Sequence, residues 1–436
     1  MTPRHIDSSS VAPRSRLETA AIKATVLVLF VAIVLGLGNS IAVLALQLVF
    51  LFILTLFVVK DAAIKNFQIN YSYGCLALVL SVTAVSVIAS FTSFSDSTYA
   101  TGIQLKFAMT FASTIYIIWI FYHCLNNGIV DSQYVIKSAI YALVIYSVVK
   151  IIIDVFVAFE IIQTQLLFTT VRQTLGAAFI STGIVFGLIR INLPPDFGIP
   201  IVLFCTLAAP KLGVRISKLF QIIAIILLMI AVLIAYSRYL WAVTFLAVLF
   251  ATLIMGRRLF FALAIIATIV VGAAASNQAI VDAVEERFFS YSVEHSDNIR
   301  INQQHALTEA IVEDPLLGKG LATYVSRLVR SKNSPYSYEL QIMATAMQYG
   351  LIGIIPILLF MASFISLVRS RDALVCSAIY VTYLFWLMAG FTNPSLIGRA
   401  AAMVFVVFIC VARLSPQLEA HSTRTRIKGT PVHGTN

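Results

Sequence analysis

Charged residues are scarce in this sequence. Asp, Glu, Lys and Arg make up 11% of the 436 residues, whereas hydrophobic residues make up 60%. A soluble globular protein has about 25% charged residues and about 45–50% apolar ones. The mean hydropathy of +0.95 over the whole chain also excludes a soluble enzyme with one membrane anchor, because a long polar domain would lower that mean. The composition therefore predicts an integral membrane protein.

Several familiar functional motifs are also missing. The five cysteines are scattered through apolar segments, so we expect no disulfide framework. The sequence contains no P-loop, no CxxC and no HExxH motif, which removes the usual sequence support for ATP-driven transport and zinc hydrolysis. The net charge of +11 comes from basic residues in short connections between apolar runs. Membrane topology explains that pattern better than nucleic-acid binding does.

Apolar runs long enough to cross a bilayer recur along the chain. About 20 helical residues span the roughly 30 Å hydrocarbon layer. The predicted spans are residues 22–37, 40–59, 72–91, 104–123, 137–158, 197–210, 217–235, 240–255, 258–275, 351–368, 374–392 and 398–413. We therefore expect an all-α, polytopic membrane protein with about twelve transmembrane helices.

The spans divide the chain into five regions. The predicted regions are a tail (1–20), a transmembrane bundle with spans 1–9 (21–275), a large periplasmic helical loop (276–350), spans 10–12 (351–413) and a second tail (414–436). Both tails are polar, and we expect them to be disordered and cytoplasmic, which places most Lys and Arg residues inside. The segment 160–196 holds a marginal apolar run, 175–188, which we interpret as a re-entrant or interfacial helix.

Two arginines and one glutamate stand out because lipid does not tolerate an uncompensated charge. Arg238 lies between two closely spaced apolar runs. It either snorkels to the headgroups or forms an anion site, for which the planar guanidinium is well suited. Arg300 begins a predicted loop helix and either binds an anion or pairs with Asp297 or Glu294. Glu339 lies one turn into a helix, where it either favours the helix N-terminus or acts as a general base.

Residue spacing gives two further local predictions. Lys150 and Asp154 stand four residues apart in the fifth span, where a mutual ion pair is the simplest interpretation. Within the large loop, apolar residues recur at helical spacing in Asn277–Phe289 and in Asn298–Val312. The run Asp314–Gly320 contains a proline and two glycines, so it is expected to end the second of these helices in a tight turn.

Three short motifs surround the predicted loop. They are Ser237-Arg238 before a new span, Arg300 with a helix and Pro315-Leu316-Leu317-Gly318-Lys319-Gly320, and Glu339-Leu340-Gln341 leading to Gln348-Tyr349-Gly350-Leu351-Ile352-Gly353. In order and spacing, this set resembles the O-antigen ligase and Wzy-type O-antigen polymerase superfamily. Ligases of this group carry His-Asn where this sequence reads Glu339-Leu340, which favours a polymerase. Arg172 and Gly183 also have an Arg-x10-Gly spacing similar to an outer-loop motif of polymerases.

The resemblance implies a metal-independent, inverting glycosyltransferase of the GT-C type that uses no cofactor. Its substrate would be an undecaprenyl-diphosphate-linked glycan at the periplasmic face of a bacterial inner membrane. The lipid bilayer and, as a candidate, a chain-length regulator protein are the expected partners, and nucleic acid is not. Glu339 would be the general base, and Arg300 and Arg238 would clamp the diphosphate. The substrate-binding candidates are Arg172, Tyr338, Tyr336 and Arg327.

Three activities compete for this sequence. A polymerase of lipid-linked repeat units is the first prediction. A ligase would use the same donor and transfer the polysaccharide to lipid A core. A transporter or flippase for lipid-linked glycans is the third, but transporters place charges along a central path and often contain repeated halves. Here the charges gather beside one loop and no repeat is visible, which favours an enzyme.

Overall fold

Apolar helices dominate the architecture. The computed structural model describes residues 15–36, 41–64, 101–163, 189–256, 291–328, 338–391 and 396–427, with isolated positions between 165 and 181 and between 260 and 285. The α-helices are α1 (Arg16–Leu35), α2 (Ile41–Ile64), α4 (Thr101–Asn126), α5 (Ser132–Ala158), α7 (Ile199–Leu207), α8 (Lys218–Ala235), α9 (Arg238–Met255), α12 (Tyr291–Glu313), α13 (Gln341–Ser363), α14 (Ala373–Leu387) and α15 (Arg399–Ile427). The expected all-α fold is confirmed.

Short elements connect some of these helices. The 3-10 turns are η3 (Pro194–Gly198), η4 (Ser326–Leu328), η5 (Phe364–Leu367) and η6 (Met388–Phe391). Strands β1 (Ile180–Ser181) and β2 (Arg190–Ile191) form one antiparallel pair, in which Ile180 faces Ile191. Within the part of the chain that the structure describes, this is the only sheet.

Seven helices of the described residues are long and apolar enough to cross a membrane. They are α1, α5, α8, α9, α13 with η5, α14 with η6, and α15. The predicted span 72–91 lies outside the described residues, and only isolated positions represent 258–275. These seven helices match predicted spans, so a polytopic membrane protein is confirmed.

Serine and aspartate side chains fix where several spans begin. Ser15 caps α1 by accepting a hydrogen bond from Glu18 N at 3.1 Å, and the Glu18 carboxylate accepts one from Ser15 N. Ser217 caps α8 in the same way, and Asp372 caps α14 by accepting from the N–H groups of its first turn. Capping satisfies N–H groups that have no partner within the helix. The polar residues just before these apolar runs therefore define where the spans begin.

Helix α15 forms the centre of the bundle. Every residue from Ala401 to Ala412 is buried, and α15 packs against α4, α5, α14 and α7. A helix that is apolar on all sides is buried in a protein core or in a membrane, and here neighbouring helices surround it. The helix continues to Ile427, so it includes the first part of the segment that we expected to be a tail from residue 414.

Helix α7 is shorter than the span predicted at 197–210. It contains nine residues, or about 14 Å of helix at 1.5 Å per residue. Pro194 and Pro195 begin the preceding η3 turn, and the chain turns again at 208–213 before α8. The segment therefore enters the bundle as irregular backbone and continues as a short buried helix. Such backbone is stable at membrane depth only when protein surrounds it.

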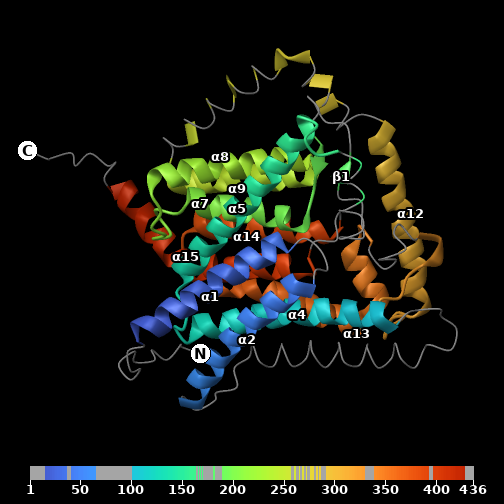
Figure 1. The fold of residues 1–436 in the computed structure, drawn as a ribbon, viewed down its shortest axis with the longest axis horizontal. Helices are drawn as coiled ribbons and strands as arrows, with labels where there is room; N and C mark the ends of the chain where they lie inside the picture. The colour runs from blue at the N-terminus through green and yellow to red at the C-terminus, as the bar shows by residue number, and fades with distance from the viewer. Residues whose placement is uncertain are drawn as a thin grey trace, which may run out of the picture.

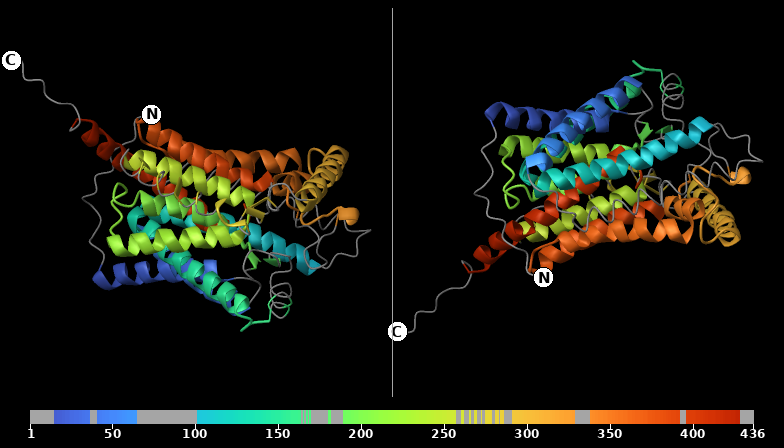
Figure 2. Two further views of the ribbon diagram at one scale, coloured as in Figure 1. Left: turned by 90° about the horizontal axis from the view of Figure 1, so that it is seen from above. Right: turned by 90° about the horizontal axis from the view of Figure 1, so that it is seen from below.

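The bundle has two chemically different ends. Helix α12 lies across one end, beside the start of α13 (Figure 1), and both turned views place it there (Figure 2). At the other end, Lys60 pairs with Glu18, Arg413 donates to Asn126 and Lys211 donates to the last turn of α9. The basic residues that we predicted to lie inside thus gather away from α12.

Candidate active site

The corner between α8 and α9 places Arg238 at the α12 end of the bundle. Tyr236 adopts the left-handed conformation, with φ of 47°, and ends α8. Ser237 then caps α9, whose first residue is Arg238. The indole N–H of Trp241 donates to the Val232 carbonyl at 3.1 Å, which ties the new helix back to the old one. Arg238 is half-buried in this corner.

A second element of the site is the turn Asp314–Gly320, which follows α12 as the sequence predicts. The turn inserts into a break in α13 at Gly350, where φ is 60° and ψ is −173°. The N–H groups of Leu351 and Ile352 donate to the carbonyls of Pro315 and Leu316 at 2.8 and 3.1 Å. The backbone N–H groups that the break in α13 leaves without helical partners therefore donate to carbonyls of the turn.

Two glycines make this close approach possible. A Cβ on Gly318 would lie 2.4 Å from the Gly350 backbone nitrogen, and a Cβ on Gly350 would lie 2.2 Å from the Leu316 carbonyl oxygen. Both glycines have positive φ, of 72° and 60°. No other residue type has both the conformational freedom and the absent side chain that these positions need.

The contact between Arg300 and Glu339 forms the centre of the candidate site. Arg300 Nε donates to Glu339 Oε2 at 2.7 Å, and both side chains are partly buried, with 29% and 17% exposed. The two residues are 39 positions apart in the sequence. Packing of α12 against the segment before α13 brings them together. Two of the three predicted catalytic residues are thus direct neighbours.

Gln303 holds the backbone of Glu339. Its Oε1 accepts a hydrogen bond from Glu339 N at 3.2 Å, and its side chain is buried. Arg300, Gln303 and Leu307 share one face of α12 because they follow at three- and four-residue intervals. Leu307 packs in a small apolar cluster with Tyr338 and Met347. The same face therefore anchors α12 and positions the carboxylate.

The other predicted substrate-binding residues have different positions. Tyr338 is 2% exposed, and its hydroxyl accepts the Val325 N–H at 2.7 Å. Desolvation raises the pKa of the Tyr338 hydroxyl, so it remains protonated. This burial favours a structural role over the expected contact with sugar. Arg327 forms an exposed ion pair with Glu309 on α12, and Arg172 and Tyr336 lie outside the described residues.

Arg190 is a cation that sequence reasoning missed. It lies in β2, and its Nε donates to the carbonyl of Ala235, the last residue of α8, at 3.4 Å. Desolvation lowers the pKa of Arg190; the nearby Glu339 carboxylate opposes this shift, and the Arg300 charge adds to it. Arg190 therefore belongs to the same electrostatic environment. In the sequence, Arg190 stands just after the marginal apolar run 175–188, which could have marked it as a candidate. The run does not indicate which residues lie near Arg190 in the fold.

A metal ion would need several ligating side chains close together. None of their His, Cys, Asp and Glu side chains forms a group of three that could hold a metal ion. Metal independence remains a prediction. The Glu339 carboxylate contacts Arg300 and interacts electrostatically with Arg190, an arrangement suited to binding an anion beside a proton acceptor.

The O-antigen ligase family model matches residues 223–358, from within α8 to within α13. We call these 136 of the 436 residues the O-antigen ligase domain, after the family that they match. The resemblance predicted from the three motifs is thereby confirmed. The match indicates a membrane glycosyltransferase of the ligase or polymerase type, with a lipid-linked glycan as its class of substrate. The comparison with curated proteins gives no match.

The O-antigen ligase domain contains most of the site. Arg238, Arg300 and Glu339 lie inside the matched residues, as does the turn that inserts at Gly350. Arg190 lies 33 residues before the domain begins. The family match therefore covers the corner of α8 and α9 and the large loop, and the segment between α5 and α8 lies outside it.

Proposed function

We propose that the protein polymerises undecaprenyl-diphosphate-linked repeat units of a surface polysaccharide at the periplasmic face of a bacterial inner membrane. The Arg300–Glu339 contact carries this proposal, because it places a carboxylate next to a guanidinium inside the O-antigen ligase domain. The basic residues at the opposite end of the bundle support a cytoplasmic assignment for that end. The site would then face the periplasm.

In the proposed reaction, a hydroxyl of the acceptor sugar attacks the anomeric carbon of the donor. The bond from that carbon to the diphosphate oxygen breaks, and undecaprenyl diphosphate leaves with the bonding electrons. Arg238 and Arg300 stabilise the charge that develops on the diphosphate. Glu339 accepts the proton of the attacking hydroxyl. A single displacement of this kind inverts the configuration at the anomeric carbon.

The Arg300–Glu339 contact gives this reaction an order of events. The donor diphosphate competes with Glu339 for the Arg300 guanidinium, because both ligands are anionic oxygens. Arginine has five N–H donors, so it can pass from one ligand to the other without losing all its partners. Donor binding would then turn the carboxylate towards the acceptor. Binding of the donor would thereby release Glu339 from Arg300 and place its carboxylate near the acceptor hydroxyl.

A ligase is the second candidate. The family model carries the description O-antigen ligase, and a ligase would use the same donor site with lipid A core as the acceptor. Glu339-Leu340 stands where ligases of the group carry His-Asn, which is why we place the polymerase first. The two activities differ in the acceptor and in the product that accumulates when the enzyme is absent.

A gene deletion tests the proposal. Electrophoresis of the surface glycan should reveal lipid A core bearing a single repeat unit if the protein is a polymerase. Core without glycan, together with polymer on the lipid carrier, would instead identify a ligase. Unchanged glycan would refute both activities.

Complementation then tests the two central residues. Glu339→Gln keeps an acceptor for Arg300 but cannot take a proton, so activity should fall by about 10²–10⁴. Arg300→Ala should lower the rate by about 10²–10³. Glu309→Gln is the matched control, because Glu309 lies on α12 with 64% of its side chain exposed. Wild-type polymer from Arg300→Ala at normal protein level would refute the diphosphate clamp.

A further inference from the structure

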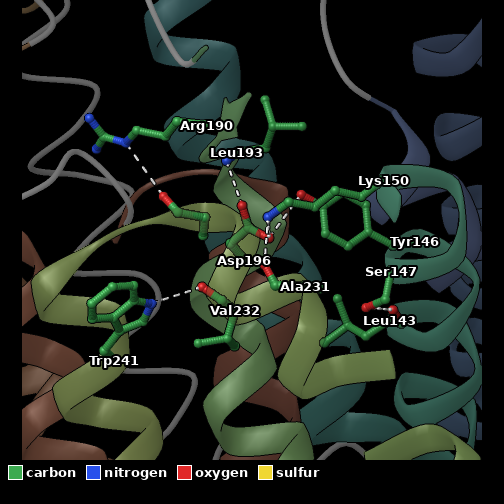
Figure 3. Close-up of polar contacts among 11 residues, drawn as sticks. Leu143, Tyr146, Ser147, Lys150, Arg190, Leu193, Asp196, Ala231, Val232 and Trp241 are labelled. Atoms are coloured by element: carbon green, nitrogen blue, oxygen red, sulfur yellow. Dashed lines mark hydrogen bonds and ion pairs between the residues drawn. The ribbon is translucent and has the colours of Figure 1, made fainter. Parts of the chain in front are cut away.

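A buried ion pair lies inside the bundle, outside the O-antigen ligase domain. Lys150 Nζ on α5 contacts Asp196 Oδ1 on η3 at 2.7 Å, and the side chains are 1% and 0% exposed. Figure 3 shows Lys150 and Tyr146 both directed at Asp196. The expected pair of Lys150 with Asp154 is wrong, because tertiary packing brings Asp196 to Lys150 from 46 residues away.

Every oxygen of the Asp196 carboxylate has a partner. Oδ1 accepts from Lys150 and also from the Tyr146 hydroxyl at 3.1 Å, and Oδ2 accepts from Leu193 N at 2.7 Å. Lys150 donates a second bond to the Ala231 carbonyl of α8 at 2.9 Å. A buried ion pair contributes little net stability compared with apolar residues of the same volume. Its presence in a membrane bundle therefore suggests a task other than stability.

The cluster fixes the chain on both sides of Arg190. Before Arg190, Asp154 Oδ1 on α5 accepts the Ile189 N–H at 2.9 Å. After Arg190, Asp196 accepts the Leu193 N–H. Because Lys150 and Asp154 lie one turn apart on α5, a single helix face holds both anchors. The short segment 189–193 is thus attached to the bundle at its two ends.

The same cluster also fixes the helix that Arg190 contacts. Lys150 donates to Ala231 and Arg190 donates to Ala235, one turn apart at the C-terminal end of α8. The Ala235 carbonyl is one of the last four of α8, which lack partners within the helix, and the helix dipole there favours cations. Figure 3 shows the Arg190 guanidinium extending away from the buried cluster. Within the described residues, Nη1 and Nη2 of Arg190 make no hydrogen bond.

We propose that Arg190 is a third arginine of the donor site, which binds the diphosphate of the lipid carrier, and that the Lys150–Asp196 pair positions it. This inference rests on the proposed function. Arg190 bonds to Ala235, which is three residues before Arg238 in the sequence. Arg190 also interacts electrostatically with Arg300 and Glu339. More than one guanidinium group at a site suits a diphosphate, which offers oxygens on two phosphorus atoms.

Binding of undecaprenyl diphosphate to the purified full-length protein in detergent tests the arginine. This probe carries the diphosphate without a glycan, so its affinity does not depend on the acceptor. Arg190→Ala should raise Kd about ten- to hundredfold, the range for a lost hydrogen bond to a charged group, and Arg190→Lys should restore only part of the affinity. Wild-type affinity in Arg190→Ala, with weak binding in Arg300→Ala, would overturn the inference and leave the proposed function standing. No binding by the wild-type protein would overturn the proposed function itself.

A double-mutant cycle tests the positioning role. Lys150→Met and Asp196→Leu are combined, because either change alone would leave a buried charge without its partner. The combined variant should weaken binding in the wild-type background and add nothing in the Arg190→Ala background. Equal weakening in both backgrounds would overturn the positioning role. Ser147→Ala is the matched control on α5, since the Ser147 hydroxyl donates to the Leu143 carbonyl of its own helix, and it should bind like the wild-type protein.

Discussion

Replacing Gly350 by alanine should detach the turn Asp314–Gly320 from α13. The backbone at Gly350 lies in a region that is essentially restricted to glycine, which costs another residue about 1–3 kcal/mol. The new Cβ would lie 2.2 Å from the Leu316 carbonyl oxygen, so the turn must move. Movement breaks the bonds from Leu351 and Ile352 to the turn, each worth about 1 kcal/mol. Backbone strain and the two lost hydrogen bonds together destabilise the contact between the turn and α13 by about 3–5 kcal/mol.

Hydrogen–deuterium exchange measures this change directly. The amides of Leu351 and Ile352 are protected by the turn, so their exchange should accelerate by about 10² to 4 × 10³ in Gly350→Ala, since 1.4 kcal/mol corresponds to a factor of ten. Helix α15 should exchange as in the wild-type protein. The local effect should be accompanied by lost activity, because the turn follows the helix that carries Arg300.

Gly128→Ala provides the matched control. Gly128 also has a positive φ, of 63°, but nothing lies within 4 Å of the Cβ that alanine would add. The control therefore carries the left-handed backbone penalty of about 1–2 kcal/mol without a collision. Unchanged exchange at Leu351 and Ile352 in Gly350→Ala would refute the collision argument. Equal acceleration of these amides in both variants would refute the assignment of the effect to this turn.

Two further substitutions test the roles assigned within the loop. Tyr338→Phe leaves the Val325 N–H without its partner and should destabilise the loop by about 1–3 kcal/mol, while KM changes little; a raised KM at unchanged loop protection would restore Tyr338 as a sugar contact. Arg327→Ala removes an exposed pair with Glu309 and should change the free energy of unfolding by less than about 1 kcal/mol. A substantially larger loss of stability in thermal unfolding would contradict that assignment.

Hydropathy was sufficient to predict the long spans. Helices α1, α5, α8, α9 and α15 lie where apolar runs of the required length predicted them. The failure at 197–210 has a physical cause. Hydropathy reports how apolar a segment is, whereas the length of α7 is set by the η3 turn before it and the turn after it. Burial among other helices, rather than lipid, explains the apolar character of α7.

The charged contacts show why the site was only partly predictable. Local spacing favoured Lys150 with Asp154, but the partner is Asp196 on a distant segment. Motif order singled out Arg300 and Glu339, which the structure places in contact, yet no local rule could join residues 39 positions apart. Arg190 carried no motif at all. Pairings over such separations depend on how helices pack, which a single sequence does not specify.

The central position of α15 has a consequence for biogenesis. A ribosome makes the chain from its N-terminus, so α4 and α5 enter the membrane before the helix around which they pack is synthesised. Lipid tails can cover their apolar faces during this interval, because a bilayer is as apolar as a leucine side chain. Insertion of α15 must then displace that lipid. Translation of α15 thus converts the helices inserted before it from a loose set into a packed bundle.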